Sequence, residues 1–207
     1  MAQLFRMHPR SPPRRLVAQV VQILRGGGII IYPTDSCYAL GWRIGDKGAQ
    51  ARIRLLRGVD QKHEFTLVCR DLSEIALYSK VDNSAYRLIK SLTPGPYTFI
   101  LKATHEVPRR LQAPRRKTIG LRVPDNPVAL AILAALGEPI LSSTLWLPGE
   151  DRPLTDADAM RERLGRQVDL IIDGGNCGLE PTTVLDLVDG TPLVVRRGKG
   201  DVSAFKQ

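Results

Sequence analysis

The stretch IIIYPTDSCYALG, residues 29–41, changes character in its middle. Three β-branched isoleucines followed by a tyrosine are typical of a buried β-strand. The chain then turns at Pro33 into Thr34, Asp35 and Ser36 before it becomes apolar again. A strand of the core is therefore expected to end in two hydroxyls and a carboxylate, which calls for a chemical reason.

Helices and strands alternate along the rest of the chain. In residues 14–24 the apolar side chains recur on one helical face, and the glycines of RGGG end that helix. In NPVALAILAAL, Asn126 is the expected N-cap and Pro127 the first helical residue. Asp189 and Gly190 predict the turn of a terminal hairpin within residues 182–197. Further helices are predicted at 46–56, 71–79, 82–92 and 156–167, and strands at 28–32, 65–69, 97–103, 118–123, 139–145 and 168–173. This order predicts an α/β fold with a mixed sheet.

The charge balance favours anionic partners such as nucleotides, RNA or an acidic surface. The 207 residues contain 30 Lys and Arg against 21 Asp and Glu, a net charge of +9. Five of these cations fall within nine residues and form a candidate RNA-binding segment: Arg109, Arg110, Arg115, Arg116 and Lys117. The alternative is that they form an ordinary solvated face.

The cysteines and the apolar stretches favour the cytoplasm. Cys37, Cys69 and Cys177 are far apart and form no CxxC pair, which argues against a disulfide framework or a zinc site. The first 15 residues lack the apolar region of a secretory signal. Nothing approaches the ~20 apolar residues of a membrane span, so no membrane partner is expected.

The familiar catalytic constellations are missing. The three histidines are scattered, and RGGG is followed by a strand and not by the GK[ST] of a P-loop. Instead, hydroxyls and arginines gather at strand ends: Thr34, Ser36, Thr118, Arg122, Ser142, Ser143, Thr144, Thr182, Thr183 and Arg196. Guanidinium groups beside hydroxyls suit carboxylate or phosphate recognition. The alternative is that threonines simply favour strands and arginines lie at sheet edges.

These strand ends lie in motifs that resemble the YrdC family of threonylcarbamoyl-AMP synthases. YPTDSCYALG is similar to the family's YPTDTxYGLG, and the match continues in order along the chain. The similar stretches are TPGPYTFIL, KTIGLRVPDNPVALAIL, PILSSTLWLPG, PTTVLDL and VVRRG. The details are most similar to the YciO branch, and the likeness runs from about residue 14 to residue 200.

The resemblance implies a fold and a reaction. The fold would be a twisted, open mixed sheet with flanking helices and a basic concave face, in one domain over residues 14–200. Residues 1–13 would be an N-terminal extension, and no second C-terminal domain is expected. The reaction joins L-threonine, bicarbonate and Mg²⁺-ATP into threonylcarbamoyl-adenylate with release of pyrophosphate. The product supplies the t⁶A modification of tRNA, and family members have been linked to double-stranded RNA binding.

The family's site residues can be carried over to matching positions. Thr34, Arg122 and Thr182 would hold L-threonine. Arg57 and Arg122 would be the catalytic cations that neutralise phosphate charge. The ATP side would be formed by His63, Thr118, Ser142, Thr144 and Arg196. No metal ligand from the protein is expected, because Mg²⁺ would come with ATP.

Two motifs depart from the family pattern. Its KxRP appears as Arg57-Gly58-Val59-Asp60, which loses one arginine and adds a negative charge. Its SAN becomes Thr144-Leu145-Trp146, and the indole of Trp146 would either stack on a base or fill the nucleotide pocket. The first hypothesis is an ATP-dependent enzyme with threonylcarbamoyl-AMP synthesis as its reaction, whose activity these departures would weaken or alter. The alternatives are an RNA-binding protein without catalysis and an adenylate-forming enzyme with another substrate.

Overall fold

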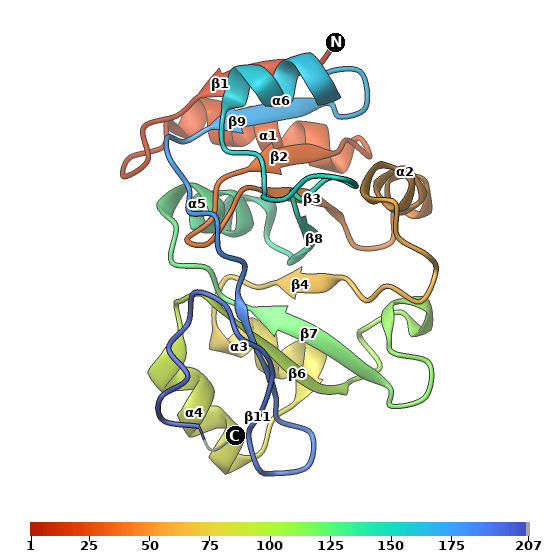
Figure 1. The fold of residues 1–207 in the computed structure, drawn as a ribbon, viewed down its shortest axis with the longest axis vertical. Coiled ribbons are helices and arrows are strands. Elements are labelled where there is room, and N and C mark those ends of the chain that lie inside the picture. Colours follow the sequence, from red (N-terminus) through yellow and green to blue (C-terminus); the bar gives the residue numbers. More distant parts are fainter. Residues whose placement is uncertain (206–207) are drawn as a thin grey trace.

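One mixed sheet runs through the computed structural model, which describes residues 1–205 (Figure 1). Ten strands follow the order β1-β9-β2-β3-β8-β4-β7-β6-β10-β11, and β5 pairs with β6 beside this path. The strands are β1 (Gln3–Arg6), β2 (Ile30–Tyr32), β3 (Ala39–Arg43), β4 (Thr66–Val68), β5 (Ser79–Lys80), β6 (Tyr97–Ala103), β7 (Thr118–Arg122), β8 (Ile140–Thr144), β9 (Leu170–Asp173), β10 (Thr183–Asp186) and β11 (Leu193–Arg196).

Parallel and antiparallel pairs both occur. β1 and β2 run parallel to β9, and β4 runs parallel to β7, whereas β3 and β8 are antiparallel to their neighbours. The hairpin of β10 and β11 is antiparallel, with Gly190 at a φ of 81° in its turn. The predicted α/β fold with a mixed sheet and a terminal hairpin is confirmed.

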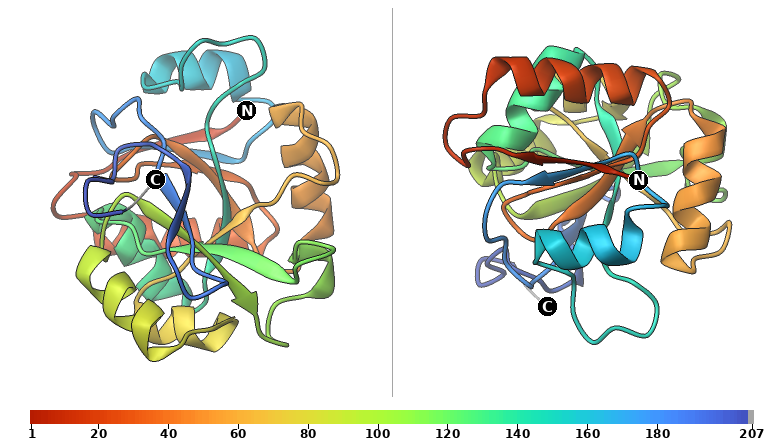
Figure 2. Two further views of the ribbon diagram at one scale, coloured as in Figure 1. Left: turned by 60° about the horizontal axis from the view of Figure 1, so that its bottom comes forward. Right: turned by 90° about the horizontal axis from the view of Figure 1, so that it is seen from above.

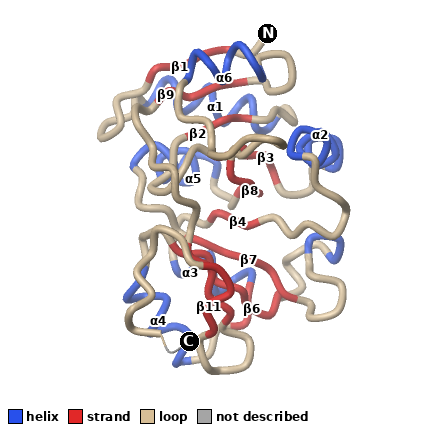
Figure 3. Tube along the Cα trace, in the orientation of Figure 1, coloured by secondary structure: helices blue, strands red, loops and turns tan. Residues whose placement is uncertain are grey.

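Short polar side chains start most of the helices. The Asn126 side chain accepts a hydrogen bond from Ala129 N at 3.0 Å, as predicted for an N-cap. Aspartates 46, 71, 82 and 156 cap four other helices in the same way. The helices are α1 (Arg14–Arg25), α2 (Lys47–Arg57), α3 (Leu72–Tyr78), α4 (Asn83–Leu92), α5 (Pro127–Leu136) and α6 (Ala157–Leu164), with a short 3₁₀ helix η1 (Arg109–Leu111). Figure 3 shows these helices and strands along the chain.

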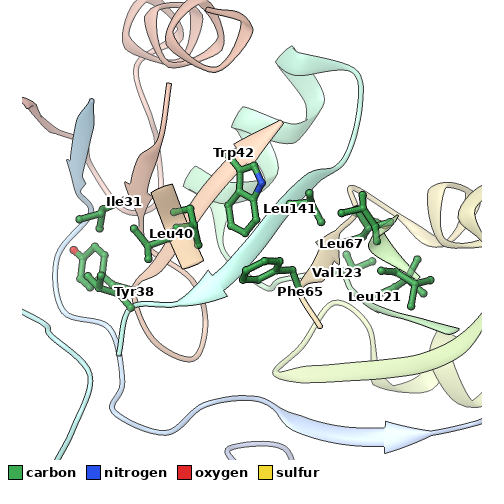
Figure 4. Packing of buried hydrophobic residues seen from close by; sticks show 14 of the residues in the cluster. Ile31, Tyr38, Leu40, Trp42, Phe65, Leu67, Leu121, Val123 and Leu141 are labelled. Carbon is green, nitrogen blue, oxygen red and sulfur yellow. The ribbon is translucent and has the colours of Figure 1, made fainter. Parts of the chain in front are cut away.

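Apolar clusters cover both faces of the sheet. On one face α1 and α5 pack against Ile30, Ile140 and Leu170. On the other face the larger cluster includes residues of α2, α3, α4 and α6 (Figure 2). There the rings of Trp42 and Phe65 meet edge to face with centroids 4.8 Å apart (Figure 4). The sheet is therefore packed against helices on both of its faces.

The structure differs from the predicted elements in three respects. Residues 1–13, expected to be an extension outside the domain, contribute β1, which pairs with β9. Strands β3 and β5 were not predicted. At the end of α1, Gly26 has a φ of −78°, and the left-handed conformation falls on Gly27 with a φ of 82°. Within residues 1–205 no helix has the length and apolar character needed to cross a membrane.

Candidate functional site

A cavity of about 120 Å³ opens on one face of the sheet, where neighbouring strands carry small or hydroxyl side chains. The register places Gly41, Ser142, Thr66, Gly120 and Ile100 in one row across β3, β8, β4, β7 and β6. Because side chains alternate between faces, Thr98, Arg122 and Thr144 lie on the same face of the sheet as this row and line the cavity. The lining residues are Thr34, Ser36, Cys37, Ala39, Arg57, His63, Glu64, Thr66, Thr98, Arg122, Ser142, Ser143, Thr144, Thr182 and Arg196.

The structure brings together most of the residues predicted for substrate and ATP. Those that line the cavity are Thr34, Arg57, His63, Arg122, Ser142, Thr144, Thr182 and Arg196. Thr118 does not line it and belongs to a neighbouring groove on the same face. Sequence reasoning assigned no role to Glu64, Thr66 or Thr98, which also line the cavity.

The hydroxyls after β2 close a tight turn at the cavity wall. Thr34 Oγ1 donates to the carbonyl of Cys37 at 2.6 Å and accepts from the Ser36 amide at 3.1 Å. Tyr38 then anchors the segment by donating to the carbonyl of Gly175 at 2.6 Å. These hydrogen bonds explain why the core strand is followed by hydroxyl residues, and two of these residues, Thr34 and Ser36, also line the cavity.

Arg122 is held by an acidic partner that sequence reasoning missed. Its guanidinium pairs with the carboxylate of Asp35 and donates to Ser36 Oγ at 3.3 Å. Asp35 also accepts from the Asp125 amide at 3.1 Å, and Lys199 Nζ donates to its carbonyl. The buried Nε of Arg122 has no hydrogen-bond partner within residues 1–205. Thus Arg122 is held in a fixed orientation while part of its hydrogen-bonding capacity is unused within the described residues.

The other two arginines of the cavity have no carboxylate partner among the described residues. Arg57 Nε donates to Ser143 Oγ at 3.0 Å, and Arg196 Nη2 donates to the carbonyl of Thr182 at 2.9 Å. Burial lowers the pKa of both guanidiniums from the ordinary arginine value. Two buried cations without a carboxylate partner are a feature that suits an anionic ligand.

Hydroxyl pairs complete the walls. The hydroxyls of Thr98 and Thr182 form a hydrogen bond of 2.8 Å, and those of Tyr32 and Ser142 form another of 2.8 Å. Burial raises the pKa of the Cys37 thiol to about 11, so this thiol is protonated near neutral pH. The cavity is thus built to orient a polar ligand and contains no activated cysteine nucleophile.

His63 and Glu64 form the rim beside Arg57. Burial lowers the pKa of His63, and the positive charges of Arg57 and Arg54 lower it further. Burial also raises the pKa of Glu64, although the charge of Arg116 opposes this. Near neutral pH the His63 imidazole is therefore uncharged. Glu64 is the acidic residue of the cavity lining.

Comparisons with known proteins agree with the arrangement of these motifs. The family model named Sua5/yciO/yrdC, described as telomere recombination, matches residues 22–198. The chain belongs to this family. Protein YciO of Escherichia coli (strain K12) is 58% identical over 205 residues, which cover 99% of this chain and 100% of YciO. The threonylcarbamoyl-AMP synthase of Halorhodospira halophila is 30% identical over 187 residues, which cover 89% of this chain and 96% of that protein.

Solved structures of the Sua5/YciO/YrdC family share the fold. The crystal structure of E. coli YciO superposes with a TM-score of 0.95 at 58% identity, covering 100% of both chains. The structure of P. abyssi Sua5 complexed with L-threonine has a TM-score of 0.85 at 25% identity, covering 94% of this chain and 57% of that one. The predicted family, with its likeness to the YciO branch, is confirmed.

Of the two motifs that depart from the family pattern, Arg57 and Thr144 line the cavity, whereas Val59, Asp60 and Trp146 lie outside its lining. Val59 packs against the larger apolar cluster. The Asp60 carboxylate turns back to accept from the amides of Lys62 and His63 at 2.9 and 3.1 Å. Trp146 donates its indole N–H to the carbonyl of Glu150 at 2.8 Å and does not line the cavity. The expectation that Trp146 fills the nucleotide pocket or stacks there finds no support at this cavity.

The predicted RNA-binding segment lies between β6 and β7, outside the cavity. Arg116 is engaged by the carboxylates of Asp186 and, at 3.7 Å, Asp189. The other four cations are exposed and have no ion pair within the described part of the chain: Arg109, Arg110, Arg115 and Lys117. All five cations of the segment are therefore exposed, but Arg116 is paired with aspartates and four are unpaired within the described part of the chain.

Proposed function

We propose that this protein is a nucleotidyltransferase that makes threonylcarbamoyl-adenylate from L-threonine, bicarbonate and ATP. The observation that carries the proposal is the pair of arginines, Arg57 and Arg196, that face a hydroxyl-lined cavity without a carboxylate partner in residues 1–205. A polyanion such as a triphosphate supplies the missing counter-charge. The synthases that are about 30% identical to this chain supply the reaction.

The chemistry needs no protein nucleophile. The amine of L-threonine takes up bicarbonate as a carbamate with loss of water. A carbamate oxygen then forms a bond to the α-phosphorus, and the bond to pyrophosphate breaks. Under this proposal Thr34, Arg122 and Thr182 orient the amino acid. Arg57 and Arg196 neutralise the phosphate charge that develops in the transition state.

The ATP side of the proposal uses the remaining polar residues of this face. His63, Ser142 and Thr144 line the cavity beside Arg196, and Thr118 lies in the adjacent groove. Within residues 1–205 no group of three or more His, Cys, Asp and Glu side chains could hold a metal ion. Mg²⁺ is commonly bound by substrate phosphates with one or two carboxylates, so this donor set suits a metal that enters with ATP. When bound, Mg²⁺ would neutralise phosphate charge.

Pyrophosphate release from Mg²⁺-ATP, with and without L-threonine and bicarbonate, tests the proposal. We expect release that requires both co-substrates, and Arg57→Ala should lower kcat/KM by about 10²–10³. Arg87→Ala is the matched control, because Arg87 is exposed on α4 and away from the cavity. Absence of release by folded protein would reject the synthase reaction. Release stimulated more strongly by another amino acid would keep the reaction class and change the substrate.

A second candidate function is binding of double-stranded RNA or tRNA without catalysis. The four exposed, unpaired cations between β6 and β7 favour it, because phosphate backbones attract such clusters. Absence of pyrophosphate release together with salt-dependent RNA binding would favour this second candidate over the first.

A further inference from the structure

A groove of about 600 Å³ lies beside the cavity on the same face of the sheet. Its lining combines apolar residues, Ile100, Ala113 and Pro114, with the cations Lys62, Arg115 and Arg116. The α2–β4 loop and the segment before β7 lie side by side at this edge of the molecule in both Figure 1 and Figure 2. Glu64 lines the groove and the cavity alike, so the two hollows meet at its side chain.

Strand β7 connects the two hollows. Thr118, Gly120 and Arg122 alternate onto the same face, with Thr118 in the groove and Arg122 in the cavity. Thr118 and Arg122 are four residue steps apart, which corresponds to about 13 Å along the strand and leaves room for an extended ligand that reaches both hollows. Gly120 keeps the path open, because a Cβ there would lie 3.3 Å from Thr98 Cγ2 and 3.5 Å from Thr66 Oγ1.

The chemistry of the two hollows matches the two ends of a nucleotide. The arginines and hydroxyls of the cavity suit phosphate groups. The apolar side chains in the groove lining suit the face of a nucleotide base. In a nucleotide the sugar joins these two parts. The side chain at the corresponding junction of the protein is Glu64.

The Glu64 carboxylate has no hydrogen-bond or ion-pair partner among the described residues. Both of its oxygens are therefore available as acceptors. A carboxylate with two such oxygens is a suitable partner for the vicinal hydroxyls of ribose, each of which donates one hydrogen. A nearby metal ion would be the competing partner.

We infer that Glu64 binds the ribose hydroxyls of the nucleotide and makes this site select ribonucleotides over 2′-deoxynucleotides. The inference rests on the proposed nucleotide site and adds the residue that determines its sugar specificity. Other acidic side chains do not line either hollow. The preference for ribose over 2′-deoxyribose is therefore assigned to the carboxylate of Glu64, which a single substitution can remove.

Calorimetric titration with Mg²⁺-ATP and with Mg²⁺-2′-deoxy-ATP tests the inference. We expect the protein to bind ATP about tenfold or more tightly than 2′-deoxy-ATP, as for loss of a hydrogen bond to a charged group. Glu64→Ala should remove this preference, and Glu64→Gln should reduce it while it preserves the shape of the side chain. Glu162→Gln on α6 is the control, because Glu162 is exposed and lines neither hollow.

The outcomes separate this inference from the proposed function. Equal affinity for the two nucleotides would overturn the role of Glu64 and leave the nucleotide site intact. A Glu64→Ala protein that binds both nucleotides less well, only in the presence of Mg²⁺, would overturn it in favour of a metal contact. Failure of the folded parent protein to bind either nucleotide would reject the proposed function and the inference together.

Discussion

The ion pair of Arg122 and Asp35 is the most enclosed charge contact of the site, with side chains that are 9% and 10% exposed. Removal of one partner from a buried pair leaves the other charge without compensation. We expect Asp35→Ala to lower the free energy of unfolding by about 3–5 kcal/mol. Urea unfolding followed by circular dichroism would measure this change.

The double variant shows whether the two residues act as a pair. Asp35→Ala combined with Arg122→Met removes both charges and should be less destabilised than the sum of the single variants. Strict additivity would mean that the two side chains are not coupled. It would also remove the reason to assign Asp35 the task of positioning Arg122.

His63 gives the site a dependence on pH. Its pKa is lowered by burial and by Arg57 and Arg54, so the ring is neutral near pH 7 and becomes charged only as the pH falls. A bound anion favours the charged ring. We therefore expect the affinity for sulfate, whose charge is constant over this range, to rise as the pH falls from about 7.5 to about 6.0. Calorimetric titration at a series of pH values measures it.

The lowered pKa of His63 also makes the free energy of unfolding depend on pH. Because the pKa of His63 is lower in the folded protein, the unfolded chain takes up the proton first as the pH falls below about 6.5. The His63 contribution to stability is therefore present at higher pH and is lost toward acid pH. His63→Gln should flatten both the sulfate and the stability profiles. A variant that retains the full pH dependence of sulfate binding would exclude His63 as its source.

At the scale of elements, the loop between β9 and β10 supports the segment that follows β2. A Cβ on Gly178 would lie 2.7 Å from the carbonyl oxygen of Ser36, and one on Gly174 would lie 2.6 Å from Pro33 Cγ. We expect Gly178→Ala to displace the segment that carries Thr34 and Ser36. It should lower the affinity for the ligand of the cavity and destabilise the fold by about 1–3 kcal/mol.

Gly26→Ala is the matched control for this prediction, because a Cβ at Gly26 would make ordinary contacts of 3.4 and 3.5 Å. The thermal unfolding midpoint and the affinity for Mg²⁺-ATP should be measured for both variants. If Gly178→Ala binds ligand as well as the parent protein does, the loop does not set the position of the cavity wall.

Local signals in the sequence predict some elements well and others poorly. The cap and apolar pattern of α5 and the turn of the last hairpin are written in adjacent residues, and both are confirmed. Strand β3 was missed because it is buried on both faces and contains Gly41, whose missing side chain is replaced by the Tyr32 ring. Strand β1 was missed because its partner β9 lies far along the chain.

The same limit applies to the site. Motif likeness placed most of the lining residues, including Arg57 and His63. The contact of Asp35 with Arg122 spans 87 positions, and it depends on a strand order that no local pattern encodes. Glu64 was missed for a related reason, since its importance lies in joining two hollows that only the folded sheet creates.

At the scale of the whole molecule, two groups of cations stand out in a protein with a net charge of +9. Arg57, Arg122 and Arg196 line the cavity, where the proposed small anion would bind. The exposed group between β6 and β7 is available to a larger one, with Arg116 excluded by its aspartate partners. A small ligand and a nucleic acid would therefore use different sets of cations, which adjoin at Arg115 in the lining of the groove.

The RNA hypothesis predicts a particular salt dependence. Each neutralised phosphate contributes about 0.9 to the slope of log affinity against log salt on a duplex. Replacement of Arg109, Arg110, Arg115 and Lys117 by Gln should thus reduce the slope for a double-stranded RNA by up to about 3.6. Fluorescence anisotropy between about 50 and 200 mM salt would measure both slopes.

A charge-matched variant separates a local binding segment from simple attraction to a basic protein. Arg10, Arg14, Arg15 and Arg87 are exposed and make no ion pair in the described chain, so their replacement by Gln removes the same charge elsewhere. If the segment binds RNA, this control should keep most of the parent slope, because counterions are released only where phosphates are contacted. Equal losses in the two variants would assign the attraction to net charge alone and reject the segment as a binding site.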